Sequence, residues 1–174
     1  EEMIARVREA WEHHRSVMVQ MPTGTGKTHV LAAIVKSVVS DRAGKVLVVT
    51  DEVLTELGTV EKLIELLREA GIEYAVFSAV EQNPTSDNVE AGFRTFKENA
   101  CDSIVALGGG SPMDCAKAVG ARIVKPKQPI PKMKGILKIH KRLPLFIAVP
   151  TTAGTGSETT LAAVITDGET RHKF

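Results

Sequence analysis

A run of three glycines between an apolar segment and a helical pattern constrains this chain more than any other feature. Residues 103–106 read Ser-Ile-Val-Ala, and residues 107–114 read Leu-Gly-Gly-Gly-Ser-Pro-Met-Asp. This order predicts a strand, a glycine turn and a helix. Three glycines leave no Cβ where a backbone must approach a bulky ligand. The free N–H groups of such a turn and of the helix N-terminus form an anion site, which suits a phosphate or pyrophosphate.

The sequence also predicts how the helix after the glycines begins. Ser111 stands where an N-cap belongs, and Pro112 stands where the first helical residue belongs. Asp114 lies three residues after Ser111, as in a capping box. The alternative is a tight turn with no ligand, but a plain turn needs one glycine rather than three. We therefore interpret the turn as a ligand-binding loop.

Alternating strand and helix patterns predict the fold. Continuous apolar or β-branched runs predict strands at 17–21, 45–50, 74–77, 103–107, 145–149 and 161–166. Amphipathic or helical runs are found at 2–15, 30–35, 60–70, 85–99 and after Gly110. We predict one α/β domain over residues 1–174, with a Rossmann-like, doubly wound, mostly parallel sheet and helices on both faces.

Polar residues follow two further predicted strands. Asp51 comes directly after strand 45–50. In a dinucleotide fold, an acid there accepts the ribose hydroxyls and repels a 2′-phosphate, which favours NAD over NADP. The alternative is a helix cap or loop acid. Thr151, Thr152 and Thr155 follow strand 145–149 among glycines, and their hydroxyls can bind phosphate, ribose or the nicotinamide amide.

Four stretches resemble the iron-containing alcohol dehydrogenase family. They are residues 45–51, 81–85, 107–114 and 148–158, and the resemblance covers about Gly44 to Phe174. It implies hydride transfer between an alcohol or aldehyde and a nicotinamide cofactor. The cofactor residues that it implies are Asp51, Gly108, Gly109, Gly110, Ser111, Asp114, Thr151, Thr152, Thr155 and Lys173.

Members of that family also have an all-helical domain, in which an aspartate and three histidines hold iron or another divalent metal. This sequence ends before that region, and its five histidines match none of the ligand motifs. In this family the metal polarises the reacting oxygen. We therefore expect the chain alone to bind dinucleotide weakly and to turn over little or no alcohol. Apolar surface left exposed by the absent domain predicts a homo-oligomer.

A second motif lies in the first forty residues. Residues 22–28 read Pro-Thr-Gly-Thr-Gly-Lys-Thr, between a predicted strand and a predicted helix. They resemble the Walker A loop, or P-loop, of helicase-type ATPases, in which backbone amides and a lysine hold phosphates and a threonine binds magnesium. The candidate Mg-ATP-binding residues are Gly24, Thr25, Gly26, Lys27 and Thr28.

The P-loop pattern has two departures. Met21 replaces its first glycine, and Asp51, the nearest candidate for the second acid, lies much closer than in helicases. We therefore do not expect ATP hydrolysis. Three interpretations stay open: a P-loop nucleotide-binding protein, a scaffold unit without ligand, or a natural or engineered hybrid. The hybrid would join a helicase-like segment, 1–40, to a dinucleotide-binding domain, 44–174.

Composition and charge restrict the partners. The chain is 43% hydrophobic and 25% charged, which is ordinary for a globular protein. The sequence has no membrane-spanning run and no signal-peptide pattern, so we expect a cytoplasmic protein. Seven of the 22 basic residues, and no acidic residue, lie in 125–142. This stretch lacks aromatics and contains three prolines, which favours a solvated surface connection over a nucleic-acid site. Cys101 and Cys115 are predicted to be core thiols.

Overall fold

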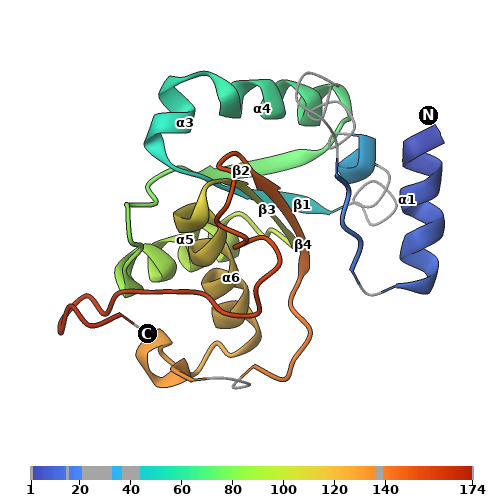
Figure 1. The fold of residues 1–174 in the computed structure, drawn as a ribbon. Helices are drawn as coiled ribbons and strands as arrows, with labels where there is room; N and C mark the ends of the chain where they lie inside the picture. The colour runs from blue at the N-terminus through green and yellow to red at the C-terminus, as the bar shows by residue number, and fades with distance from the viewer. Residues whose placement is uncertain (1, 15, 21–32, 37–43, 136–138, 174) are drawn as a thin grey trace.

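The computed structural model describes residues 2–14, 16–20, 33–36, 44–135 and 139–173, and its centre is a four-stranded parallel sheet (Figure 1). The strands are β1 (Lys45–Val49), β2 (Glu73–Phe77), β3 (Ser103–Gly108) and β4 (Leu145–Pro150). Their order across the sheet is β2-β1-β3-β4, and all three strand pairs are parallel. The chain leaves β1 in one direction towards β2 and later continues on the other side at β3. The topological switch point, where open α/β sheets bind ligands, is therefore between β1 and β3.

Helices cover both faces of this sheet, as predicted (Figure 1). The helices α3 (Glu52–Glu56) and α4 (Thr59–Glu69) lie on one face, and α5 (Ser86–Glu98) and α6 (Gly110–Val124) lie on the other. Strand β1 is buried on both sides. Leu47 and Val49 belong to the core beneath α5 and α6, while Val46 and Val48 belong to the core beneath α4. The continuous apolar run of β1 follows from this two-sided burial, because successive side chains point to opposite faces.

The two longer helices next to β2 form for different local reasons. Helix α4 buries Val60, Leu63, Ile64 and Leu67, which is the spacing of one helical face. Leu66, on the edge of this face, is only half-buried. Helix α5 begins with a capping box. The Thr85 side chain accepts a hydrogen bond from the Asn88 backbone, and the Asn88 side chain accepts one from the Thr85 backbone.

The N-terminal part of the chain agrees only partly with the predictions. Helix α1 (Glu2–His13) is confirmed, although Val7 is its one buried residue. Residues 16–20 do not form the predicted strand. Residues 33–36 are helical, and Ile34 and Val35 are buried. The P-loop pattern at 22–28 lies outside the described residues.

The predicted strand at 161–166 is wrong. The segment has one isolated bridge position, at Thr166, and the Leu161 side chain is 99% exposed. Side chains of α6 bind several of its backbone groups: Lys117 donates to the Ala162 carbonyl, and Asp114 accepts from the Val164 amide. Because these contacts satisfy backbone groups that a ladder would otherwise pair, the segment remains irregular.

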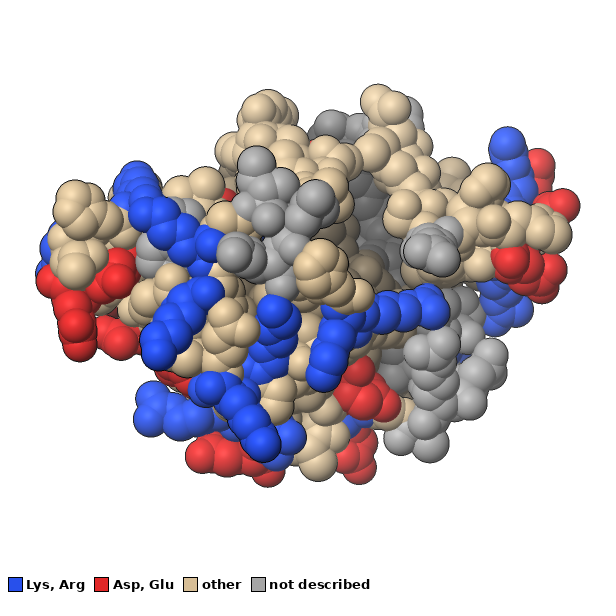
Figure 2. All heavy atoms as spheres, turned by 90° about the horizontal axis from the view of Figure 1, so that it is seen from below, with Lys and Arg blue, Asp and Glu red and all other residues tan. Residues whose placement is uncertain are grey.

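The basic stretch 125–142 is a surface connection between α6 and β4. It contains the short 3-10 helix η2 (Ile130–Met133), which anchors it through the buried Ile130. The side chains of Lys127, Lys132, Lys134, Lys141 and Arg142 are exposed. Figure 2 shows Lys and Arg side chains gathered across this face of the molecule. Among the described residues, no helix has the length and apolar character needed to cross a membrane.

Candidate functional site

The triple-glycine turn lies at the carboxyl end of β3. Gly108 is the last residue of that strand and has a φ of +150°, and a Cβ on it would lie 2.5 Å from Cγ of Pro112. No other residue fits there without a shift of Pro112. Gly109 has an extended backbone and precedes the first residue of α6, Gly110. The turn therefore delivers the N-terminus of a 15-residue helix to the ligand-binding edge of the sheet.

The predicted cap of this helix is wrong in detail. The N-cap is Gly109, and no side chain caps the helix. Ser111 lies inside the first turn because the helix begins two residues earlier than predicted, with Met113 N donating to Gly109 O at 3.3 Å. The hydroxyl of Ser111 instead accepts a hydrogen bond from the backbone N–H of Asn83 at 3.3 Å. Asp114 makes an ion pair with Lys117 rather than closing a capping box.

The threonine loop, which we define as residues 151–157, lies against the glycine turn. Thr151 N donates to Gly108 O at 2.9 Å. The hydroxyl of Thr152 is 3.0 Å from the place that a Cβ on Gly109 would take. Thr155 lies 3.9 Å from the corresponding point at Gly110. The structure thus brings together two loops that are about forty residues apart in the sequence.

Asp51 lies at the carboxyl end of β1, beside β3. It is the N-cap of α3, and its Oδ1 accepts a hydrogen bond from Leu54 N at 2.9 Å. A Cβ on Gly108 would lie 3.4 Å from Cδ1 of Leu54, so the first turn of α3 contacts the glycine turn. The helix-cap alternative for Asp51 is therefore correct. It does not exclude a ribose contact, because a carboxylate has two oxygens and about four acceptor positions.

Lys173 is held near the same edge of the sheet by a contact with Asn83. Its ammonium donates to Asn83 Oδ1 at 2.6 Å, and the backbone N–H of Asn83 donates to the Ser111 hydroxyl. The C-terminal segment is held there by backbone hydrogen bonds: Thr166 N donates to Pro84 O, and Ser86 N donates to Thr166 O, at 2.8 and 2.9 Å. Asn83 has a φ of +57°, which asparagine tolerates better than most residues. The turn at residues 83–85 thus links the C-terminal segment to the first turn of α6.

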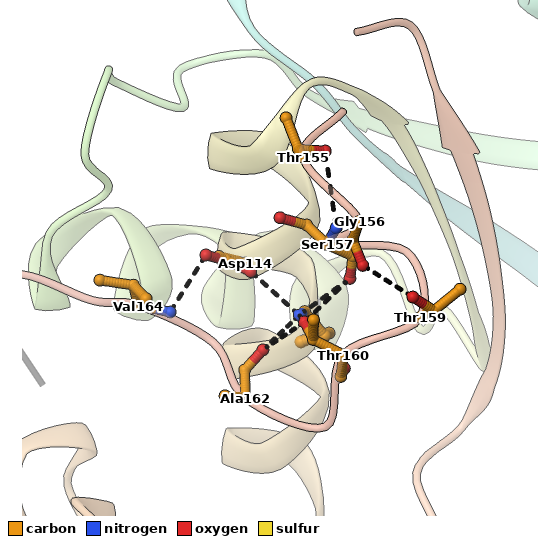
Figure 3. A network of polar contacts seen from close by, with 9 residues as sticks. Asp114, Thr155, Gly156, Ser157, Thr159, Thr160, Ala162 and Val164 are labelled. Carbon is orange, nitrogen blue, oxygen red and sulfur yellow. Dashed lines mark hydrogen bonds and ion pairs between the residues drawn. The ribbon is translucent and has the colours of Figure 1, made fainter. Parts of the chain in front are cut away.

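Lys117 is the site-adjacent residue that the sequence analysis missed. Its ammonium lies 2.9 Å from an oxygen of Asp114, and both side chains are 14% exposed. It also donates to oxygens of Ser157, Thr160 and Ala162 (Figure 3). The available signal was an Asp and a Lys three residues apart on the helix that follows the glycines.

The described residues do not fit a metal centre. They contain no group of three or more His, Cys, Asp or Glu side chains that could hold an ion. Burial raises the pKa of the Cys101 thiol, and burial together with the nearby Asp114 carboxylate raises the pKa of the Cys115 thiol to about 12. Burial therefore favours the protonated form of both thiols.

Comparison with known proteins identifies the family. The model of the iron-containing alcohol dehydrogenase family matches residues 20–174. A 1,3-propanediol dehydrogenase from Klebsiella pneumoniae is 45% identical over 132 residues, which are 75% of this chain and 34% of that protein. A choline dehydrogenase from Bacillus subtilis is 42% identical and is covered over 33% of its length, with 75% of this chain. The chain therefore spans about a third of the length of these curated relatives.

Comparison with solved structures gives the same result. A 1,3-propanediol oxidoreductase structure superposes with a TM-score of 0.78 at 39% identity, over 92% of this chain and 42% of that one. A sulfoacetaldehyde reductase from Bifidobacterium kashiwanohense, solved with NAD⁺, has a TM-score of 0.69 at 27% identity and is covered over 42% of its length, with 91% of this chain.

The family match includes the stretch that resembles a P-loop. It begins at residue 20, well before the predicted boundary near Gly44. Neither the family model nor the relatives support a separate P-loop segment or a hybrid chain. Since the match leaves out only residues 1–19, the chain belongs to the iron-containing alcohol dehydrogenase family.

Proposed function

We propose that this chain is the NAD-binding portion of a dehydrogenase that interconverts a small alcohol and its aldehyde or ketone. The observation that carries the proposal is the contact between the glycine turn and the threonine loop, in which Thr151 N binds Gly108 O and Thr152 lies over Gly109. The NAD⁺ held by the Bifidobacterium relative supports the choice of ligand.

Each part of the site has a proposed role. The backbone N–H groups of Gly109, Gly110 and Ser111 bind the pyrophosphate, because N–H groups at the start of a helix have no intrahelical acceptor and no side chain caps α6. The hydroxyls of Thr151, Thr152 and Thr155 bind the ribose or the nicotinamide amide. Bound NAD supplies the hydride acceptor or donor.

Asp51 and Lys173 have proposed roles at the adenosine end. Asp51 binds the ribose hydroxyls and selects NAD over NADP by charge repulsion. Lys173 lies near the adenosine, held in place by Asn83. Asp114 supports the site indirectly, through its ion pair with Lys117 and its hydrogen bond from Val164 N.

The proposal assigns this chain binding rather than turnover. Its described residues hold no candidate metal ligand set, and in this family a metal activates the substrate oxygen. We therefore propose that the 174-residue chain binds dinucleotide but oxidises alcohols slowly or not at all. Robust, metal-dependent oxidation of a small alcohol by the purified chain would contradict this part. A separate Mg-ATP site at residues 24–28 has no support beyond the sequence pattern.

The first test is a fluorescence titration of the purified chain with NADH, repeated on Gly109→Val. The valine Cβ would stand 3.0 Å from the Thr152 hydroxyl, and its methyl groups would occupy the space above the turn. We expect saturable binding by the wild type and at least a roughly tenfold rise in Kd for the variant, about 1.4 kcal/mol.

A matched control places the same side chain elsewhere. Glu65→Val is on an exposed position of α4, away from the glycine turn, and should bind NADH like the wild type. Equal binding by Gly109→Val and the control, with unchanged circular dichroism, would place the dinucleotide away from the triple-glycine turn.

A further inference from the structure

The ammonium of Lys117 is surrounded by oxygens from two parts of the chain. One is the carboxylate of Asp114, one turn earlier on α6, at 2.9 Å. The others come from the last residue of the threonine loop and the segment that follows it: the carbonyls of Ser157 at 3.0 Å and Thr160 at 3.4 Å, the hydroxyl of Thr160 at 2.9 Å, and the carbonyl of Ala162. Figure 3 shows these contacts converging on a single point beside α6.

This arrangement fixes an otherwise irregular segment. Residues 157–164 belong to no strand, and Leu161 is almost fully exposed. Their attachment to α6 consists largely of polar contacts, since Asp114 also accepts a hydrogen bond from Val164 N at 3.1 Å. Asp114 and Lys117 together therefore hold both the carbonyls and an amide of this segment.

The same segment continues directly from the threonine loop. At its start, the loop is held by the hydrogen bond from Thr151 N to Gly108 O. At its end, it is held by the contact of Lys117 with Ser157 O. Thr152 and Thr155 lie between these two attachment points, over Gly109 and Gly110. Without the second attachment, the threonine hydroxyls would be tethered at one end only.

We propose that Lys117 is a positioning residue of the cofactor site: its ammonium attaches residues 157–162 to α6 and thereby holds the threonine loop over the triple-glycine turn. The inference rests on the proposed function, because it assumes that the loop contacts a dinucleotide. In this role Lys117 acts through the loop and not by contacting the cofactor itself. It acts by keeping the loop in its binding arrangement in most molecules.

Loss of the ammonium would do more than remove one hydrogen bond. The Asp114 carboxylate and three carbonyl oxygens would then face one another without a cation between them, which favours separation of the segment from the helix. The apparent Kd rises as the fraction of molecules in the binding arrangement falls. If the loop is in place in about a tenth of the variant molecules, the apparent Kd for NADH increases about tenfold.

The test compares Lys117→Met with Lys97→Met in the full chain. Methionine retains most of the aliphatic length but has no charge or donor. Lys97 is an exposed lysine near the end of α5, so its variant controls for the change in composition and net charge. We expect about tenfold weaker NADH binding for Lys117→Met and no change for Lys97→Met.

Hydrogen exchange on the cofactor-free proteins gives an independent readout. We expect faster exchange at Thr159 and Val164 in Lys117→Met, since the amides of these residues donate to Gly156 O and to the Asp114 carboxylate. The amides of β3 should be unaffected. Asp114→Asn, which keeps the shape of the side chain and removes its charge, should shift both readouts in the same direction to a smaller extent. If Lys117→Met does not fold, Asp114→Asn provides the test of the proposal in its place.

Chemical rescue separates positioning by the charge from simple packing. Lys117→Ala lacks the side chain beyond Cβ, and n-propylammonium supplies the missing carbons and ammonium. We expect millimolar n-propylammonium to recover part of the NADH affinity, and the same concentration of 1-propanol to recover none. Equal recovery by the two additives would mean that Lys117 acts only by filling space, and would overturn the proposal.

The outcomes distinguish this inference from the proposed function. If the wild type binds NADH and Lys117→Met binds it equally well with unchanged exchange, the positioning role is wrong and the proposed function stands. If the wild type does not bind NADH, both the proposed function and a role in cofactor binding are wrong. The exchange data would then show only whether Lys117 orders the segment.

Discussion

Asp51 follows β1 directly and begins α3, so its carboxylate has an observed role as a helix cap and a proposed role in cofactor selection. One oxygen accepts the Leu54 amide at 2.9 Å, which caps the helix. The negative charge at the carboxyl end of β1 is what would repel the 2′-phosphate of NADP. The capping role needs only an acceptor atom, whereas the discrimination between cofactors needs a charge. Substitutions can therefore separate the two roles.

We predict that Asp51→Asn keeps the helix and changes the cofactor preference. Asparagine is as good an N-cap as aspartate, so the free energy of unfolding should change little. The ratio of the NADPH Kd to the NADH Kd should fall, because the repulsion is lost. Asp51→Ala should lose the cap as well, at a cost of about 1 kcal/mol in urea unfolding. An unchanged cofactor ratio in Asp51→Asn would show that Asp51 is only a cap.

At the scale of elements, the sequence correctly predicted strands that are set by their own local pattern. It failed for segments whose structure depends on contacts with residues distant in the sequence. Strand β1 was predictable because burial on both faces requires an unbroken apolar run. The strand expected at 161–166 also looked apolar, but Leu161 has no neighbour to pack against, and Lys117 and Asp114 bind the backbone that a strand would pair. The start of α6 was misplaced by two residues, because an extended Gly109 caps it without a side chain.

The contact between α5 and α6 is another feature that no local pattern indicates. Gly92 lies on α5 where a Cβ would be 2.9 Å from Cγ2 of Val119 on α6 and 3.2 Å from Cδ1 of Phe77 on β2. Val119 is fully buried, so the helix cannot move aside at no cost. The two helices therefore approach closely at a position without a side chain.

We predict that Gly92→Val destabilises the fold by about 1–3 kcal/mol through overpacking. Val119→Ala alone should also destabilise it, because it leaves a space in the core. The double variant should be more stable than the sum of the two losses implies, since one change fills the space that the other opens. Urea unfolding of all four proteins completes the cycle, and strict additivity would argue against a direct contact.

At the scale of the whole molecule, the sheet and α6 enclose a core that includes a thiol. Cys115 is a fully buried residue of α6, with Leu47, Ile104 and Val119 in the same hydrophobic cluster. Burial is the main reason why its pKa is raised to about 12, and the Asp114 carboxylate adds to the effect. In the unfolded chain the thiol returns to its ordinary pKa of 9.0. The folded and unfolded states therefore bind this proton with different affinity.

This difference makes stability depend on alkaline pH in a known direction. Above pH 9 the unfolded chain releases the thiol proton while the folded chain keeps it, so the free energy of unfolding falls as pH rises from 9 towards 12. Between pH 8 and pH 10 this amounts to about 1.4 kcal/mol. Cys115→Ala lacks the thiol and should lose about that much less stability over the same interval in urea unfolding. Cys101→Ala, which keeps Cys115, is the control and should follow the wild type more closely. Parallel profiles for the wild type and Cys115→Ala would mean that the thiol is not shielded from water in the folded chain.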